Sequence, residues 1–193
     1  MRALGAVTAI ILVCVTLIGV AQGATFGLRR VTREHRTNLP VHGNVYPLGV
    51  YYTQITIGTP PVAFNVSIDT GSTDTLVPGV SCAGCAVTST RYSAAKSSTA
   101  RPLDCGSHPD VTCPLCLNHG TTCGFKDTYV TCAKSDPNKS CSVGGPLHRD
   151  IVCLGEHLCV DAVIGEIAEQ DADFYQFSVI DGTFATPWRC QSC

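Results

Sequence analysis

The sequence predicts an all-β fold that is rich in disulfides. Apolar and polar residues alternate over 51–57 and again over 62–69, which is the period of half-buried strands. Thr59-Pro60-Pro61 separates the two runs, and prolines belong in a turn because they cannot donate to a strand ladder. No helical period is visible between residues 80 and 123, where Ser, Thr, Gly, Pro and Cys dominate. The 193 residues give room for one domain, or for one lobe of a larger one.

Residues 1–23 are predicted to be a secretory signal peptide. A basic Arg2 precedes an apolar run over 3–20, and Ala21-Gln22-Gly23 places small residues at the two positions that a signal peptidase reads. The apolar run is also long enough for a retained membrane anchor. The small residues after it and the single basic flank favour cleavage.

Residues 24–42 form a short leader or pro-segment that carries four arginines against Glu34. A basic segment of this kind suits a pro-segment lying across an acidic cleft, and it equally suits a solvated tail. The remainder of the chain is acidic, and no basic patch with interleaved aromatic residues occurs. Nucleic acid is therefore not an expected partner.

The chain has 13 cysteines, and removal of the signal peptide with Cys14 leaves 13 − 1 = 12. A dense and even set in a secreted chain predicts disulfides, although spacing alone does not give their pairing. Three pairs have the two-residue spacing of zinc ligands: Cys82 and Cys85, Cys113 and Cys116, Cys190 and Cys193. An oxidising compartment favours disulfides over zinc, and no strand-to-helix pattern points to a redox pair. We therefore predict no metal site and no cofactor.

The second predicted strand ends in Ile68-Asp69-Thr70-Gly71-Ser72. Its alternation places an apolar set of residues on one face and Asp69 on the other, so the strand presents this carboxylate at its end. Gly71 allows a sharp turn. Thr70 and Ser72 carry hydroxyls that can donate hydrogen bonds to a carboxylate. Such a turn suits a catalytic acid, while the plainer interpretation is a loop aspartate that caps a turn.

The surrounding residues resemble the N-terminal lobe of the pepsin-like aspartic proteases. The resemblance rests on several spaced features, which are Tyr51-Tyr52, Ile57-Gly58-Thr59-Pro60-Pro61, Asp69 to Ser72, Val77-Pro78 and Cys82. It implies a lobe over 43–184, with 185–193 as an unassigned tail. It also implies that Asp69 is a catalytic carboxylate supported by Thr70, Gly71 and Ser72, and that the substrate is a peptide or protein. The implied location is the secretory pathway, with the product secreted or held in a vacuolar or lysosome-like compartment.

Residues 123–129 resemble the strand that enters the substrate-covering flap of this family, and 143–152 resemble the strand that leaves it. Tyr129 is then the candidate flap residue; alternatively it is an ordinary strand tyrosine. Residues 130–142 replace the usual short flap tip, and a disulfide between Cys132 and Cys141 would close them. Residues 160–167 are predicted to form another strand.

The sequence departs from the family pattern at three places: Leu76 where the family often has Trp, the altered flap tip, and no Gly after Phe184.

An aspartic protease needs two carboxylates, and this sequence has one Asp-Thr-Gly. Asp181-Gly182-Thr183 is the nearest other string, but its order is wrong. The chain alone is therefore expected to be inactive. We consider three explanations: a fragment whose second lobe supplies the other Asp, a chain that pairs two copies, and a non-catalytic secreted Cys-rich binding protein.

Two glycosylation sequons are present, at Asn65 and at Asn138. Asn138 lies in an expected surface loop and is the candidate glycan site. Asn65 lies in the strand that leads to Asp69, where a glycan would fit poorly.

Overall fold

A computed structural model describes residues 39–45, 49–106, 111–130, 136, 138–156, 158–172, 174 and 179–185 of the chain. The predicted signal peptide, the leader up to residue 38 and the tail beyond Ala185 lie outside these residues. So do Cys132, Cys190 and Cys193.

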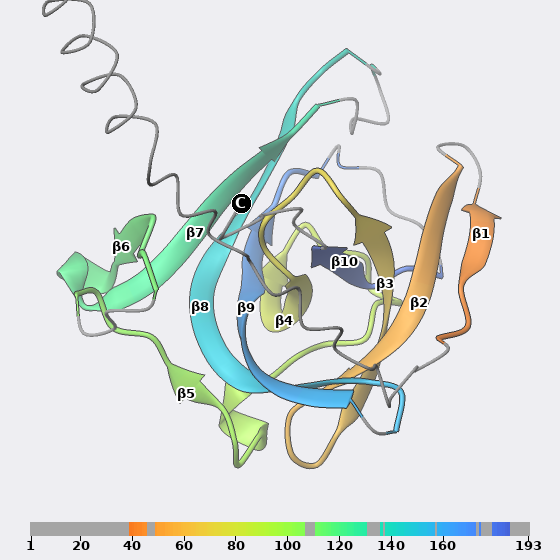
Figure 1. The fold of residues 1–193 in the computed structure, drawn as a ribbon. Coiled ribbons are helices and arrows are strands. Elements are labelled where there is room, and N and C mark those ends of the chain that lie inside the picture. Colours follow the sequence, from red (N-terminus) through yellow and green to blue (C-terminus); the bar gives the residue numbers. More distant parts are fainter. Residues whose placement is uncertain are drawn as a thin grey trace, which may run out of the picture. The chain divides into compact units, whose positions relative to one another are not determined.

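Nearly all regular structure in the described part is strand, which confirms the predicted all-β class (Figure 1). The two helical elements are single 3₁₀ turns, η1 (Ala94–Lys96) and η2 (Asn118–Gly120). The strands are β1 (His42–Val45), β2 (Val50–Ile57), β3 (Val62–Asp69), β4 (Leu76–Ala83), β5 (Arg101–Pro102), β6 (Leu115–Leu117), β7 (Thr122–Tyr129), β8 (Cys141–Leu154), β9 (Leu158–Gln170) and β10 (Gly182–Ala185).

The strands follow the order β1-β2-β3-β10-β4-β9-β8-β7-β6, with β5 beside β8. A further antiparallel pairing of β2 with β8 closes the strands from β2 to β8 into a ring. Two pairs of neighbouring strands in the ring are parallel: β10 with β3, and β4 with β9. The long β8 and β9 curve together around one side in Figure 1, which lets them join both parts of the ring.

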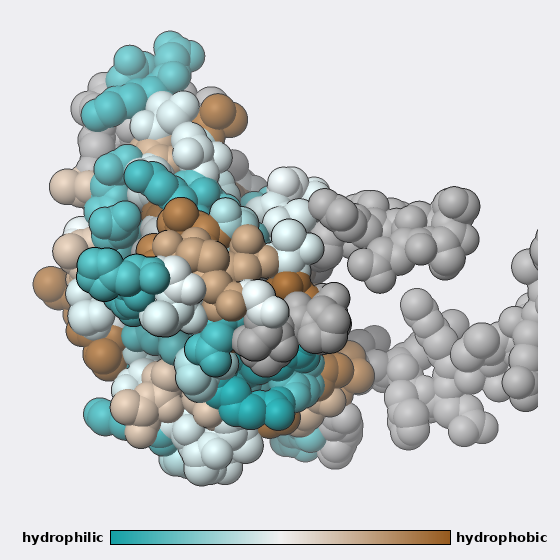
Figure 2. Space-filling view, turned by 90° about the vertical axis from the view of Figure 1, so that its left-hand side faces the viewer, coloured by the Kyte–Doolittle hydropathy of each residue, from teal (hydrophilic) through white to brown (hydrophobic). Residues whose placement is uncertain are grey.

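Two clusters of buried side chains hold the sheet together. The first joins strands of the ring through Ile55, Phe64, Val77 and Ile164, all of them 1 % exposed or less. The second includes Leu103, Phe125 and Leu147 together with half-buried cysteines. On the face turned to the viewer in Figure 2, apolar surface occurs in small areas between hydrophilic side chains.

One carboxylate, Asp150 of β8, is almost completely buried, with 1 % exposure. Its Oδ1 accepts hydrogen bonds from Thr99 Oγ1 at 2.6 Å and from the Ile151 backbone N–H at 2.8 Å, and its Oδ2 accepts one from the Tyr92 hydroxyl at 2.8 Å. Burial alone would raise the pKa of Asp150, but the hydrogen bonds from Thr99, Ser97, Tyr92 and the Ile151 backbone together lower it. The carboxylate is therefore an ionised tie between β8 and the loop of residues 92–99.

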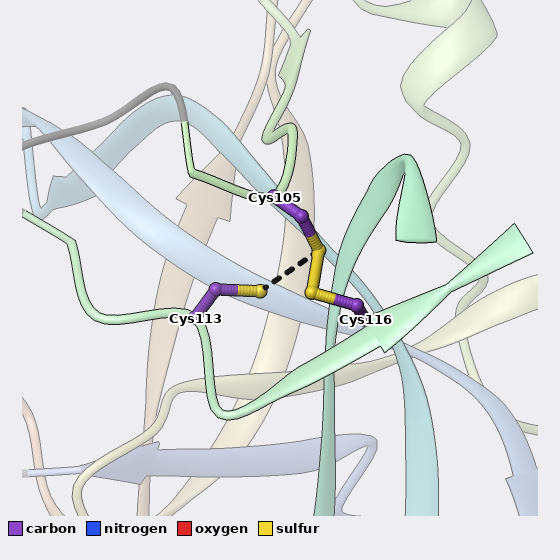
Figure 3. A group of neighbouring side chains, drawn as sticks. All are labelled: Cys105, Cys113 and Cys116. Atoms are coloured by element: carbon purple, nitrogen blue, oxygen red, sulfur yellow. Dashed lines mark hydrogen bonds between the residues drawn. A yellow bond between two sulfur atoms is a disulfide. The ribbon is translucent and has the colours of Figure 1, made fainter. Parts of the chain in front are cut away.

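Every cysteine in the part of the chain that the structure describes is disulfide-bonded, as the sequence predicts. Cys82 pairs with Cys85, Cys105 with Cys116, Cys113 with Cys123, and Cys153 with Cys159. Cys141 is also bonded, while its predicted partner Cys132 lies outside the described residues. Of the two described pairs with zinc-like spacing, only Cys82 and Cys85 are bonded to each other. Three of these bonds lie between residues 82 and 123, where the strands and 3₁₀ turns are short, and Figure 3 shows Cys105 bonded to Cys116 beside Cys113.

No helix among the described residues combines the length and the apolar character needed to cross a bilayer.

Candidate active site

Asp69 is the last residue of β3, and β3 lies between β2 and β10. The parallel ladder places Asp69 beside Ala185 of β10, and on the other side β2 pairs with β3 up to Ser67. The carboxylate is half-buried and lines a cavity of about 310 Å³. This position agrees with the expectation that the strand anchors itself through Phe64 and Val66, which are fully buried, and presents Asp69 at its end.

The turn after Asp69 orients its carboxylate. The Gly71 backbone N–H donates a hydrogen bond to Asp69 Oδ1 at 2.8 Å. A Cβ on Gly71 would stand 3.3 Å from the same oxygen, which is tighter than most contacts of real Cβ atoms. The backbone at Gly71 is not in the left-handed region. Glycine is therefore favoured here because the carboxylate comes close, and not because the turn needs a positive φ. The roles of Thr70 and Ser72 as donors to Asp69 stay predictions.

Tyr129, the last residue of β7, lines the same cavity as Asp69 although the two are sixty positions apart in the sequence. β7 pairs with β8 in a hairpin, where Tyr129 stands opposite Cys141. The ring packs edge-on against Phe174, with 5.7 Å between centroids. Burial raises the pKa of Tyr129, the carboxylates of Asp127, Asp69 and Asp74 raise it further, and the nearby Ser72 hydroxyl acts in the opposite direction. The phenol therefore keeps its proton and can donate a hydrogen bond inside the cavity.

Most of the other cavity residues are apolar, among them Leu76, Val143, Ile167 and Ile180. An apolar cavity with a few polar groups is the usual form of a ligand site. The site thus places one carboxylate and one phenol against a surface that suits apolar side chains.

Asp181 lines the same cavity, and its structural role is not visible in the sequence. Its Oδ2 accepts a hydrogen bond from the Asn65 backbone N–H at 2.9 Å, and its Oδ1 accepts one from that of Thr90 at 2.7 Å. It stands level with Asn65, four residues before Asp69 along β3, which is roughly 13 Å at strand spacing. Asp181 therefore fixes β10 against β3 and is too far from Asp69 to share a proton with it.

Asp127 of β7 faces a like charge. Burial raises its pKa, and the carboxylate of Asp74 raises it further. The folded chain holds the proton of Asp127 more tightly than the unfolded chain does. The contribution of Asp127 to the free energy of unfolding therefore falls as pH rises from about 3.9 through the raised pKa.

Asp127→Asn should therefore increase the free energy of unfolding at pH 7, by less than about 1 kcal/mol on the scale of partly exposed charges. The increase should vanish near pH 3, where both chains are uncharged at this position. Urea unfolding of the two proteins at both pH values measures the effect, and an equal gain at pH 3 would contradict the assigned cause.

The two sequons differ in their surroundings. Asn138 is exposed, whereas Asn65 lies in β3 between two neighbouring strands and its backbone N–H is bonded to Asp181. When the chain is secreted from a eukaryotic host, Asn138→Gln should remove the mass of one glycan, and Asn65→Gln should leave the mass of attached glycan unchanged. Mass spectrometry before and after enzymatic deglycosylation tests both statements.

The all-β ring, its disulfides and a strand that ends at a cavity-lining aspartate are consistent with a lobe of the pepsin-like aspartic protease class. In agreement, residues 50–108 match the family of eukaryotic aspartyl proteases. Chymosin of Camelus dromedarius is 31% identical over 159 residues, which is 80% of this chain and 37% of chymosin. Rhizopuspepsin of Rhizopus chinensis is 45% identical over 79 residues, which is 34% of this chain and 20% of that protein. Vacuolar protease A of Neurospora crassa is 27% identical over 146 residues, 75% of this chain and 30% of that protein.

Over these regions the chain is similar to the pepsin-like aspartic proteases. Its matched region spans well under half the length of each of these relatives.

Proposed function

We propose that this chain forms the N-terminal lobe of an aspartic-type endopeptidase in which Asp69 is one of two catalytic carboxylates. The observation that carries the proposal is that Asp69, at the end of β3, and Tyr129, at the end of β7, line one cavity. The family relationship supports hydrolysis of peptide bonds as the reaction.

In this chemistry two carboxylates about 3 Å apart share one proton, because two like charges so close cannot both ionise cheaply. The ionised carboxylate takes a proton from a water molecule, which attacks the peptide carbonyl, and the protonated one polarises the carbonyl oxygen. The two pKa values belong to the pair and not to either residue. No metal ion or organic cofactor takes part.

Asp181, the other aspartate that lines the cavity, is held by two backbone N–H groups, and we infer that the second carboxylate comes from outside the residues described here. We propose that a second lobe supplies it. Tyr129 would lie over the substrate as the flap residue, and its proton, retained because of burial and nearby carboxylates, would be available to the substrate.

The substrate is proposed to be a peptide or protein with apolar side chains near the cleaved bond, since Leu76, Val143 and Ile167 face the cavity. The signal-peptide pattern and the disulfides support a route through the secretory pathway, to the exterior or to a vacuolar or lysosome-like compartment.

Sequencing the transcript beyond the codon for Cys193, together with a cleavage assay at acidic pH on an unfolded protein, tests the proposal. We expect a second Asp-Thr-Gly or Asp-Ser-Gly in the longest natural form, and cleavage by that form. A verified stop codon, with secretion of a product that binds peptides without cutting them, would instead support the non-catalytic binding protein.

A further inference from the structure

The cavity that Asp69 lines has one polar wall and one apolar wall. The polar wall belongs to β3 and to β10 with the residue before it, and consists of Ser67, Asp69, Asp181 and Thr183. The apolar wall belongs to β4, β8 and β9, and includes Leu76, Val143 and Ile167. Such a cavity suits a ligand that combines a hydrocarbon side with a polar group.

Asp69 and Asp181 lie at the two ends of the polar wall. The Asp181 backbone N–H donates a hydrogen bond to the Asn65 carbonyl oxygen at 2.7 Å, which places Asp181 level with Asn65 on β3. Asn65 stands four residues before Asp69, or roughly 13 Å at strand spacing. The hydroxyls of Ser67 and Thr183, 3.2 Å apart, lie between the two ends. A group bound at Asp181 would therefore share the cavity with Asp69 without reaching the reacting bond.

The Asp181 carboxylate can accept more hydrogen bonds than the protein gives it. Its Oδ2 accepts one from the Asn65 backbone N–H and its Oδ1 accepts one from that of Thr90. An ionised carboxylate has about four acceptor positions, so about two remain. Among the described residues, no Lys, Arg or His lies within ion-pair distance of Asp181. The described lining residues include two aspartates and no basic side chain, so the cavity carries negative charge that a ligand could balance.

A lysine or arginine side chain matches both walls of this cavity. Its hydrocarbon stem can pack along the apolar wall while its charged head reaches a carboxylate. Attraction between opposite charges is stronger in a partly apolar cavity than in open water. An extended peptide advances about 3.3–3.6 Å per residue, so the separation of Asp69 and Asp181 corresponds to roughly two residues plus one long side chain.

We propose that Asp181 is a specificity-determining residue that binds a lysine or arginine side chain of the peptide, within about two residues of the bond held at Asp69. The inference rests on the proposed function for the position of that bond at Asp69. Binding of the basic side chain itself does not require cleavage. Asp181 would keep its two backbone hydrogen bonds and use its remaining acceptor positions for the ammonium or guanidinium group.

The test measures equilibrium binding of matched peptides to the full disulfide-bonded chain and to the longest natural form. The two peptides share one apolar sequence and differ at a single position, which holds either lysine or norleucine and is moved residue by residue along the peptide. Norleucine keeps the four-carbon stem of lysine and lacks its ammonium group. At one position the lysine peptide should bind about 5- to 15-fold more tightly, between the scales of an exposed ion pair and of a hydrogen bond to a charged group. The advantage should shrink at about 1 M salt, where charges are strongly screened.

Two variants assign the preference to Asp181. Asp181→Asn should bring the affinities for the two peptides to about the same value, mainly by weakening the lysine peptide. A purely structural role would weaken both peptides alike, and thermal unfolding measured alongside reports any loss of fold. Asp171→Asn is the matched control, because Asp171 also accepts a backbone hydrogen bond, from the Ser142 N–H at 2.7 Å, but does not line the cavity. This variant should keep the preference for lysine.

The outcomes separate this inference from the proposed function. No preference for lysine at any position, including no binding of either peptide, would overturn the inference, and so would an unchanged preference in Asp181→Asn. Cleavage by the longest natural form without a preference for lysine would overturn the inference and leave the endopeptidase standing. Selective binding of the lysine peptide without cleavage by that form would support the inference and contradict the endopeptidase.

Discussion

Asp69→Asn should lower the rate of peptide cleavage by the longest natural form of this protein by about 10²- to 10⁴-fold, the range that a positioned proton-transfer group contributes. Asparagine keeps the shape of the side chain and can still accept the hydrogen bond from the Gly71 N–H. It cannot take a proton from water. The loss should therefore fall mainly on kcat, with the fold and KM little changed. Initial rates on a peptide substrate at acidic pH, with thermal unfolding measured alongside, give both quantities.

Asp161→Asn is the matched control for this experiment. It also removes one carboxylate, but Asp161 lies on β9, is 39% exposed and pairs with Arg101 and Arg149. Cleavage by this variant should equal that of the unchanged protein. If Asp69→Asn cleaves as fast as the control, Asp69 is not a catalytic carboxylate and the proposed function loses its main support.

The part of the fold closest to Asp69 could be predicted because its information is local. Alternation over 62–69 follows directly from the two faces of a strand, one packed on the core through Phe64 and Val66 and the other carrying Asp69, which lines the cavity. The two prolines after Thr59 mark the turn that brings β3 back beside β2. Tyr129 came from resemblance and not from periodicity, and the structure places it in the same cavity as Asp69.

The features that could not be predicted depend on residues far apart in sequence. β10 is only four residues long, yet it fits between β3 and β4 and meets β3 in parallel more than a hundred positions later. The residues Gly182–Ala185 alone do not predict that pairing, because four residues are too few to show a period. The same limit applies to Asp181, whose backbone partners Asn65 and Thr90 are brought near only by the closed ring.

Disulfide pairing was open for a related reason. The two-residue spacing of Cys82 and Cys85 is identical to that of Cys113 and Cys116, but only the first pair is bonded. Cys82 lies in β4, and the glycine at position 84 has a positive φ that turns the chain back at once. Cys116 instead lies in β6, which pairs with β7, and it is bonded to Cys105. Secondary structure, and not spacing, selects the partner.

Asp150→Ala should reduce the free energy of unfolding by about 3–5 kcal/mol at pH 7, because it removes several hydrogen bonds to a charged group, each worth about 1.5–3 kcal/mol. The carboxylate is the common acceptor for Thr99, Tyr92 and the Ile151 backbone. Its removal leaves buried donors without an acceptor, each costing about 1–3 kcal/mol, and opens a small cavity beside them. Since a domain of this size is stable by only about 5–15 kcal/mol, the loss would be a large share of the total. Urea unfolding with the disulfides intact measures it.

The pH dependence separates the charge of Asp150 from its packing. Hydrogen bonds lower its pKa in the folded chain, so its charged form stabilises the fold above the unfolded pKa of about 3.9. That contribution falls as pH drops through the folded pKa. Asp150→Asn should therefore be clearly less stable than the unchanged chain at pH 7, with the difference shrinking below about pH 4. Tyr92→Phe removes one donor and keeps the charge, so it should cost about 1.5–3 kcal/mol, the scale of one hydrogen bond to a charged group. If the loss of unfolding free energy in Asp150→Asn stays constant from pH 7 to pH 3, packing and not the ionised carboxylate holds β8 against the loop of residues 92–99.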